Sequence, residues 1–126
     1  MSKENLALSA SGEEAAVDFL KGSGYKIIAR NYRTRLGEID IIACDKDTYC
    51  FIEVKARYSD KFGLPSEAVT RFKQRQISKA ALAFLKEKHL LDKKARFDVA
   101  AVTYAQGLPR VELIKDAFEL SGNFIY

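Results

Sequence analysis

The chain has 126 residues, of which 48% are hydrophobic and 30% are charged. A length and an apolar content of this size suit one buried core, which excludes a disordered chain and favours a single domain over residues 1–126. The 21 Lys and Arg residues outnumber the 17 Asp and Glu residues, and the formal net charge of +4 suits an anionic partner such as nucleic acid without requiring one.

The cysteines and the hydropathy of the chain exclude two further classes. Cys44 and Cys50 are the two cysteines, and neither lies in a CxxC motif or a Cys/His cluster that would indicate structural zinc. We expect both thiols to be free. The sequence contains no apolar run with the length of a signal peptide or a membrane span, so we expect no membrane association and a cytoplasmic location.

The first half of the chain predicts one helix followed by three strands in a meander. Ser11 and Glu14 have the spacing of a capping box, so we expect the helix to begin at Ser11 and to end between residues 21 and 24. Alternating, β-branched and aromatic residues predict strands over residues 25–32, 36–44 and 49–57, joined by polar turns near residues 33–35 and 45–47.

The second half predicts a helix between two strands, followed by a final strand. Residues 58–65 have the composition of a loop, and Ser66 or Thr70 should cap a helix that ends at about Lys88. Further strands are expected over residues 97–104 and 110–114. The order α-β-β-β-α-β-β implies a crossover that makes the fourth strand parallel to the third.

A group of charged residues on the second and third strands indicates chemistry. In GEIDIIA (residues 37–43), strand alternation puts Glu38 and Asp40 on one face and Ile39, Ile41 and Ala43 on the other. In FIEVKAR (residues 51–57), the same alternation groups Phe51, Glu53, Lys55 and Arg57. If these strands form a hairpin, Asp40 and Glu53 converge, and Lys55 lies roughly 7 Å along the strand from Glu53.

Two carboxylates and a lysine in this arrangement suit phosphodiester hydrolysis. Carboxylate oxygens and waters complete the octahedral shell of Mg²⁺, and Mn²⁺ has similar ligand preferences. Lys55 would orient the attacking water or offset the charge that develops on the phosphate. The alternative is that Asp40, Glu53 and Lys55 form cross-strand ion pairs on a solvated face. The spacing D-x(12)-E-x-K, flanked by Ile and Val, favours the catalytic interpretation.

The segments GEIDIIA and FIEVKAR, followed by Lys73 and Arg96-Phe97-Asp98, resemble the YraN family of uncharacterised bacterial proteins. This family belongs with the PD-(D/E)XK nucleases and is similar to archaeal Holliday junction resolvases. The resemblance runs from about Gly12 to Phe118. It implies a three-layer, restriction-endonuclease-like αβββαβ core with a mixed central sheet. It also implies that Asp40 and Glu53 are metal ligands, that Lys55 is the catalytic lysine and that Glu13 matches the helix-one acid of the resolvases. Ile39 stands where the superfamily motif has proline.

Several other residues have two interpretations each. Glu13 is a candidate catalytic residue, but an acid in the first turn of a helix also favours the helix dipole. Lys73 would lie on the inward stripe of the second helix, close enough to touch a phosphate. Together with Arg35, Arg57 and Arg71 it forms our candidate set for nucleic-acid binding. Glu38 could bind a metal through water, or it could bond a backbone group or a neighbouring arginine, which we favour. Asp98 is expected to be an ion-pair partner of Arg96 and not a ligand. Glu14 is expected to serve the capping box, and His89 is expected at the surface.

The sequence therefore predicts a Mg²⁺- or Mn²⁺-dependent endonuclease acting on DNA, including branched or structured forms. One alternative is a non-catalytic nucleic-acid-binding module that keeps the nuclease fold. Another is an accessory protein that assembles with DNA repair or uptake proteins. Resolving a junction would require a symmetric homodimer to present two sites. The sequence does not separate DNA from RNA as the substrate.

Overall fold

The computed structural model describes residues 3–58 and 69–120, and the expected loop after Tyr58 and the alternative cap at Ser66 lie outside these ranges. Seven elements follow the predicted order: α1 (Lys3–Gly22), β1 (Lys26–Arg33), β2 (Glu38–Asp45), β3 (Thr48–Arg57), α2 (Arg71–Glu87), β4 (Lys94–Ala105) and β5 (Leu108–Phe118). The predicted α/β class with a mixed central sheet is confirmed.

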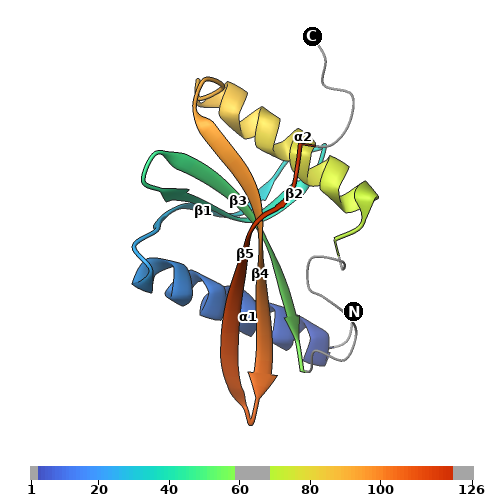
Figure 1. The fold of residues 1–126 in the computed structure, drawn as a ribbon. Coiled ribbons are helices and arrows are strands. Elements are labelled where there is room, and N and C mark those ends of the chain that lie inside the picture. Colours follow the sequence, from blue (N-terminus) through green and yellow to red (C-terminus); the bar gives the residue numbers. More distant parts are fainter. Residues whose placement is uncertain (1–2, 59–68, 121–126) are drawn as a thin grey trace.

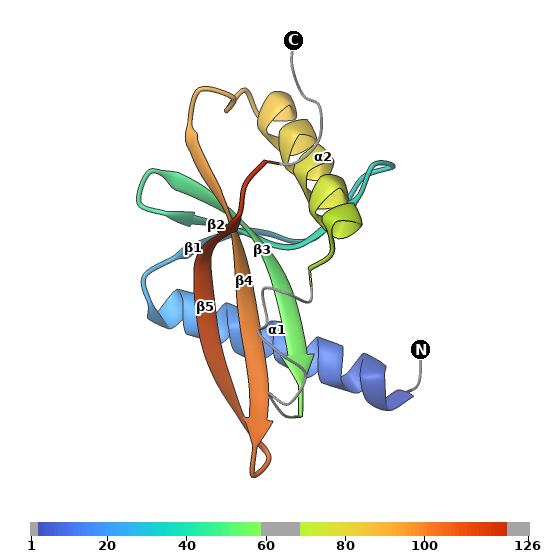
Figure 2. The ribbon, with the colours of Figure 1, turned by 45° about the vertical axis from the view of Figure 1, so that its right-hand side comes forward.

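The sheet has five strands in the spatial order β1-β2-β3-β4-β5, and each strand pairs with its neighbours in sequence. β3 and β4 are parallel, as the crossover predicted, whereas the other three pairs are antiparallel. Figures 1 and 2 show α2 carrying the chain from the end of β3 back to the start of β4. The sheet is strongly twisted, and β1, β2 and the first half of β3 turn away from β5.

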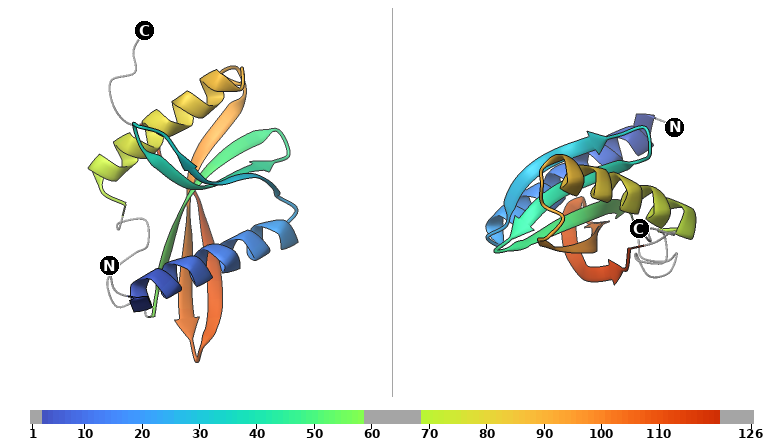
Figure 3. Two further views of the ribbon diagram at one scale, coloured as in Figure 1. Left: turned by 180° about the vertical axis from the view of Figure 1, so that it is seen from behind. Right: turned by 90° about the horizontal axis from the view of Figure 1, so that it is seen from above.

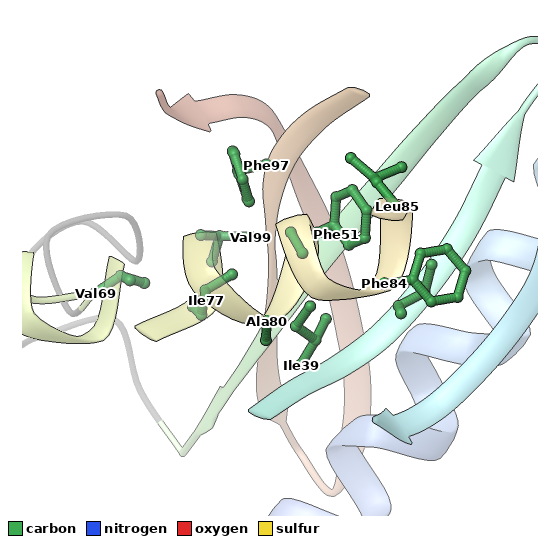
Figure 4. Close-up of a cluster of buried hydrophobic side chains, with 11 residues drawn as sticks. Ile39, Phe51, Val69, Ile77, Ala80, Phe84, Leu85, Phe97 and Val99 are labelled. Atoms are coloured by element: carbon green, nitrogen blue, oxygen red, sulfur yellow. The ribbon is translucent and has the colours of Figure 1, made fainter. Parts of the chain in front are cut away.

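The two helices cover opposite faces of the sheet, which gives three layers (Figure 3). Ala16, Val17 and Leu20 of α1 pack on one face. The apolar stripe of α2 packs on the other face, where its side chains meet Ile39, Phe51 and Val99 of the sheet (Figure 4). Thr70 caps α2, because its side chain accepts a hydrogen bond from the backbone N–H of Lys73. Among the described residues, no helix combines the length and the hydropathy that a membrane crossing requires.

The start of α1 differs from the prediction. The helix already includes Lys3, so Ser11 lies in its middle and not at its cap, and Glu13 is not in its first turn. The preceding residues 3–8 are mostly strong helix formers, which lets the helix continue through Ser9 and Ser11. The Ser11 hydroxyl hydrogen bonds with the Tyr104 hydroxyl at 2.5 Å, and Glu14 pairs with Arg30. Neither side chain serves the predicted capping box.

The predicted alternation of β2 is also wrong at one point. Ile41 and Ala43 face α1 as a pair, but Ile39 packs with Ile42 on the α2 side. The pairing of β2 with β3 ends at Ile41 and Ile52, and Asn31 in the neighbouring strand adopts a φ of 52°. This irregularity changes which face the next residue occupies, so strict alternation could not place Ile39.

Candidate active site

Asp40 lies where β2 and β3 separate. Its Oδ2 accepts a hydrogen bond from the backbone N–H of Val54 at 2.8 Å, in place of the backbone acceptor that a continued ladder would supply. The register of the hairpin, in which Ile41 faces Ile52, puts Asp40 level with Glu53. One carboxylate oxygen of Asp40 is therefore fixed by the backbone of the strand that carries Glu53 and Lys55.

Glu53 is the buried carboxylate of the site, with only 4% of its side chain exposed. Burial raises its pKa to about 7, and the neighbouring Asp40 carboxylate raises it as well, against the opposing influence of Lys73 and Lys55. A carboxyl group held near its titration point at neutral pH gains from any additional positive charge. A cation that approached Glu53 would therefore favour its ionised form.

Two lysines from different elements approach the same oxygen of Glu53. Nζ of Lys73, in the first turn of α2, lies 3.3 Å from Oε1, and Nζ of Lys55 lies 3.7 Å from it. The side chain of Lys73 is 42% exposed and that of Lys55 is 32% exposed, so both can also face solvent. Lys55 thus folds back along its strand onto Glu53, closer than the spacing of the two residues along the strand suggests.

The described residues offer a metal ion two carboxylates at this point. Asp40 and Glu53 interact electrostatically, but no group of three or more His, Cys, Asp or Glu side chains within residues 3–58 and 69–120 is arranged to hold a metal. Mg²⁺ is often bound by one or two carboxylates, with waters and substrate phosphate filling the other positions. The oxygen donors of Asp40 and Glu53 fit that pattern.

Glu13 does not join Asp40 and Glu53 in a three-carboxylate group. Its Oε1 accepts a hydrogen bond from Nδ2 of Asn31 at 2.9 Å and lies 3.5 Å from Nε of Arg30. The side chain is 15% exposed. In this arrangement Glu13 ties α1 to the irregular point of β1, and its catalytic role stays a prediction.

The candidate nucleic-acid-binding residues lie on the elements that carry the site or on connections to them. Lys73 and Arg71 come from the first turn of α2, Arg35 from the β1–β2 connection and Arg57 from the end of β3. Arg35 and Arg71 are exposed. Nη2 of Arg57 is covered and has no hydrogen-bond partner among the described residues. These positions are compatible with the predicted binding role and do not test it.

Three other predicted positions have structural partners or lie apart. Glu38 pairs with Arg33 at 3.4 Å, as expected for a carboxylate beside an arginine. Asp98 is fully buried and accepts from Nε of Arg96 at 3.0 Å, which confirms the predicted ion pair. His89 is exposed just after α2, as predicted.

Sequence reasoning missed two residues that position the site. Asn31 holds Glu13, and its preference for positive φ among non-glycine residues was the available signal. Gly12 lets α1 lie directly on β3, because a Cβ at this position would come within 2.5 Å of Cβ of Ala56. A glycine inside a helix carries little information about which neighbour it approaches, so this contact had no clear signal.

Comparison with known proteins shows that bacterial proteins are similar to this chain in sequence over nearly its whole length. Residues 12–102 match the model of a family described as "Uncharacterised protein family UPF0102". A UPF0102 protein of Geobacter metallireducens is 51% identical over 121 residues, which cover 96% of this chain and 99% of the relative. UPF0102 proteins of Geotalea uraniireducens and Syntrophus aciditrophicus are each 52% identical, and the alignments cover 94% of this chain and 94% and 93% of those relatives. These matches confirm the resemblance noted from the sequence.

Proposed function

The chain belongs to the uncharacterised protein family UPF0102, and from the geometry of its site we propose that it is a metal-dependent endonuclease that hydrolyses phosphodiester bonds in DNA. The observation that carries this proposal is the convergence of Asp40, Lys55 and Lys73 on the buried Glu53. A structural ion pair needs one cation for one carboxylate. Here Lys55 and Lys73, from two elements, approach one oxygen of the buried Glu53, and the Asp40 carboxylate on a third element lies close enough to raise the pKa of Glu53.

The electrostatics of the site favour a divalent ion. The pKa of Glu53 is raised to about 7, so the metal-free protein holds this carboxylate at a cost in free energy at neutral pH. A divalent cation bound between Asp40 and Glu53 would favour both ionised carboxylates. When bound, Mg²⁺ or Mn²⁺ supplies the Lewis acidity that polarises the phosphate and lowers the pKa of a coordinated water.

The residues of the chain then have distinct roles. Asp40 and Glu53 hold the metal, and the hydrogen bond from Val54 fixes the orientation of Asp40. With an ion bound by Glu53, Lys55 and Lys73 would no longer be needed to neutralise that carboxylate. Their ammonium groups are then available to orient water and to offset negative charge on a phosphate. Arg35, Arg57 and Arg71 would bind the flanking phosphates of the backbone.

The test is a cleavage assay with the full chain on linear, nicked, flapped and four-way DNA, with EDTA, Mg²⁺ or Mn²⁺. We expect metal-dependent cleavage of at least one substrate, which Asp40→Asn and Lys55→Ala both abolish. Cleavage that persists in Asp40→Asn would reveal a contaminating nuclease or another site. DNA binding without cleavage under any of these conditions would favour the non-catalytic binding module instead.

A further inference from the structure

Two large apolar side chains stand exposed beside the candidate active site. Leu36, in the connection between β1 and β2, is 50% exposed, and Phe72, in the first turn of α2, is 62% exposed. Phe72 directly precedes Lys73, whose Nζ contacts Glu53, and Leu36 lies four residues before Asp40. Leu36 and Phe72 therefore lie on the segments that lead into Asp40 and Lys73 of the site.

The backbone brings these two side chains to one ridge. Gly37 lies so close to α2 that a Cβ would collide with the carbonyl oxygen of Gln76. Phe72 is four residues before Gln76 and thus on the same flank of the helix, one turn earlier. Figures 2 and 3 both show the β1–β2 connection beside the N-terminal half of α2. We call the side chains of Leu36 and Phe72 the apolar ridge.

The connection that carries Leu36 is closed by its own hydrogen bonds. The Thr34 hydroxyl oxygen accepts from the backbone N–H groups of Leu36 and Gly37 at 3.0 and 3.1 Å. The backbone N–H of Thr34 donates to the carbonyl of Gly37 at 2.8 Å. A turn fixed in this way loses little conformational entropy on binding, so Leu36 can contact a partner without reordering of the turn.

Arginines that form no ion pair with another described residue flank the ridge in sequence. Arg35, Arg71 and Arg75 are exposed, and none of them takes part in an ion pair within the described parts of the chain. The first turn of α2 contains no acidic residue. An acidic protein would meet the charges, but the ridge adjoins a site whose proposed substrate is a phosphodiester. Nucleic acid therefore matches both the surface and the neighbouring site.

We propose that Leu36 and Phe72 form a wedge that inserts between unstacked bases of a DNA substrate while the surrounding arginines hold its phosphates. Apolar side chains inserted at a base step kink a duplex, and the energy of unstacking is lowest where the DNA is already nicked or branched. The wedge thus selects distorted DNA for the adjacent site. This inference rests on the proposed function, because it names the class of DNA that the site would receive.

The salt dependence of DNA binding distinguishes the apolar contacts of the wedge from the phosphate contacts of the surrounding arginines. Each Lys or Arg contact with a phosphate releases counterions, so removing one flattens the dependence of log K on log salt concentration. An apolar contact releases none. Leu36→Ala and Phe72→Ala should weaken binding to a four-way junction about tenfold each, with an unchanged slope. Arg75→Ala should reduce the slope.

Base unstacking is measured on the same complexes with 2-aminopurine at the branch point, in EDTA so that no strand is cut. Wild type should raise the fluorescence, and Leu36→Ala and Phe72→Ala should remove most of that rise. Phe72→Trp should bind the junction with the affinity of wild type, because it keeps a large aromatic side chain at this position. The matched control is Leu108→Ala, since Leu108 is 71% exposed at the β4–β5 hairpin, away from α2 (Figure 1).

The outcomes keep this inference separate from the proposed function. If wild type binds no DNA even at low salt, both fail. If it binds DNA, but the two variants match it in affinity and fluorescence, the wedge alone is overturned and the proposed function stands. Weaker binding with the full fluorescence rise would also overturn insertion, because the side chains would then touch DNA without separating its bases.

Discussion

Nζ of Lys73 lies 3.3 Å from Oε1 of Glu53, so the first turn of α2 is tied to the middle of β3 through the candidate active site itself. Lys73 lowers the pKa of Glu53 against the effect of burial. Lys73→Met should therefore raise the pKa of Glu53 above its present value of about 7. Carbon-detected NMR titration of the Glu53 carboxyl group measures this. Lys79→Met, on the exposed side of the same helix, is the control. An equal shift of the Glu53 pKa in both variants would mean that the overall charge of the protein, and not the contact with Lys73, sets this pKa.

The stability of the metal-free protein should fall as the pH rises past the ordinary pKa of a glutamate. The pKa of Glu53 is 4.5 as its unperturbed value and about 7 in the folded chain, so the folded state binds more protons between these values. Folding thus loses up to about 3 kcal/mol over this window from Glu53 alone. Glu53→Gln cannot titrate there. Its free energy of unfolding, measured with urea, should rise relative to wild type between pH 4.5 and pH 7.

Saturating Mn²⁺ should reverse that trend in wild type, because it binds the ionised carboxylates of the folded state alone. A constant difference between Glu53→Gln and wild type across the window would show that Glu53 does not titrate there.

Asp40 has a structural contact and a proposed metal contact, and two substitutions separate them. Asp40→Asn keeps an oxygen that can accept from Val54 and removes the charge that repels Glu53. Without metal it should be as stable as wild type or more stable. Asp40→Ala leaves the Val54 N–H without this acceptor and should cost about 1–3 kcal/mol. Both variants should lose the rise in melting temperature that Mn²⁺ gives wild type. An unchanged response of Asp40→Asn to Mn²⁺ would remove Asp40 from the metal site.

Lys55→Ala should separate metal binding from cleavage. Lysine is proposed to act on water and phosphate, so the variant should keep its stabilisation by Mn²⁺ while cleavage falls by at least about a hundredfold. Thermal melting across a Mn²⁺ titration and single-turnover cleavage measure the two effects. Lys86→Ala, at the far end of α2, should alter neither. Cleavage at the wild-type rate in Lys55→Ala would assign Lys55 to the ion pair with Glu53 alone.

Gly12→Ala should move α1 away from β3. The added Cβ would lie 2.5 Å from Cβ of Ala56, so the helix must shift, at a cost of about 1–3 kcal/mol measured by urea unfolding. Gly22→Ala is the control, since a Cβ there meets no atom within 4 Å. The double variant Gly12→Ala/Ala56→Gly should recover part of the loss, because it removes the clashing atom. If the double variant is no more stable than Gly12→Ala, the loss of stability does not come from the clash with Ala56.

The sequence by itself determined the element order and the parallel crossover, and it predicted the residues of the candidate site. Hydrophobic periodicity and turn composition are local properties, and they were sufficient for α2 and the three strands of the meander, whereas they left Ser66 and Thr70 as alternative caps of α2. The pairing of Asp40 with the strand of Glu53 followed from the hairpin, because a short turn fixes the register. Lys73 was also predicted to face the site, from its spacing to Ile77 along the helix.

Only the tertiary structure decided what Ser11 contacts, which face Ile39 occupies and what holds Glu13. Each depends on contacts between residues far apart in the sequence. Ser11 is inside a helix where it bonds Tyr104, and Glu13 is held by Arg30 and Asn31. The Asp40 carboxylate replaces a backbone acceptor beside Val54, and the change of face at Ile39 accompanies it. Local patterns carry no record of such partners, because the energy of these contacts exists only once the strands and helices have come together.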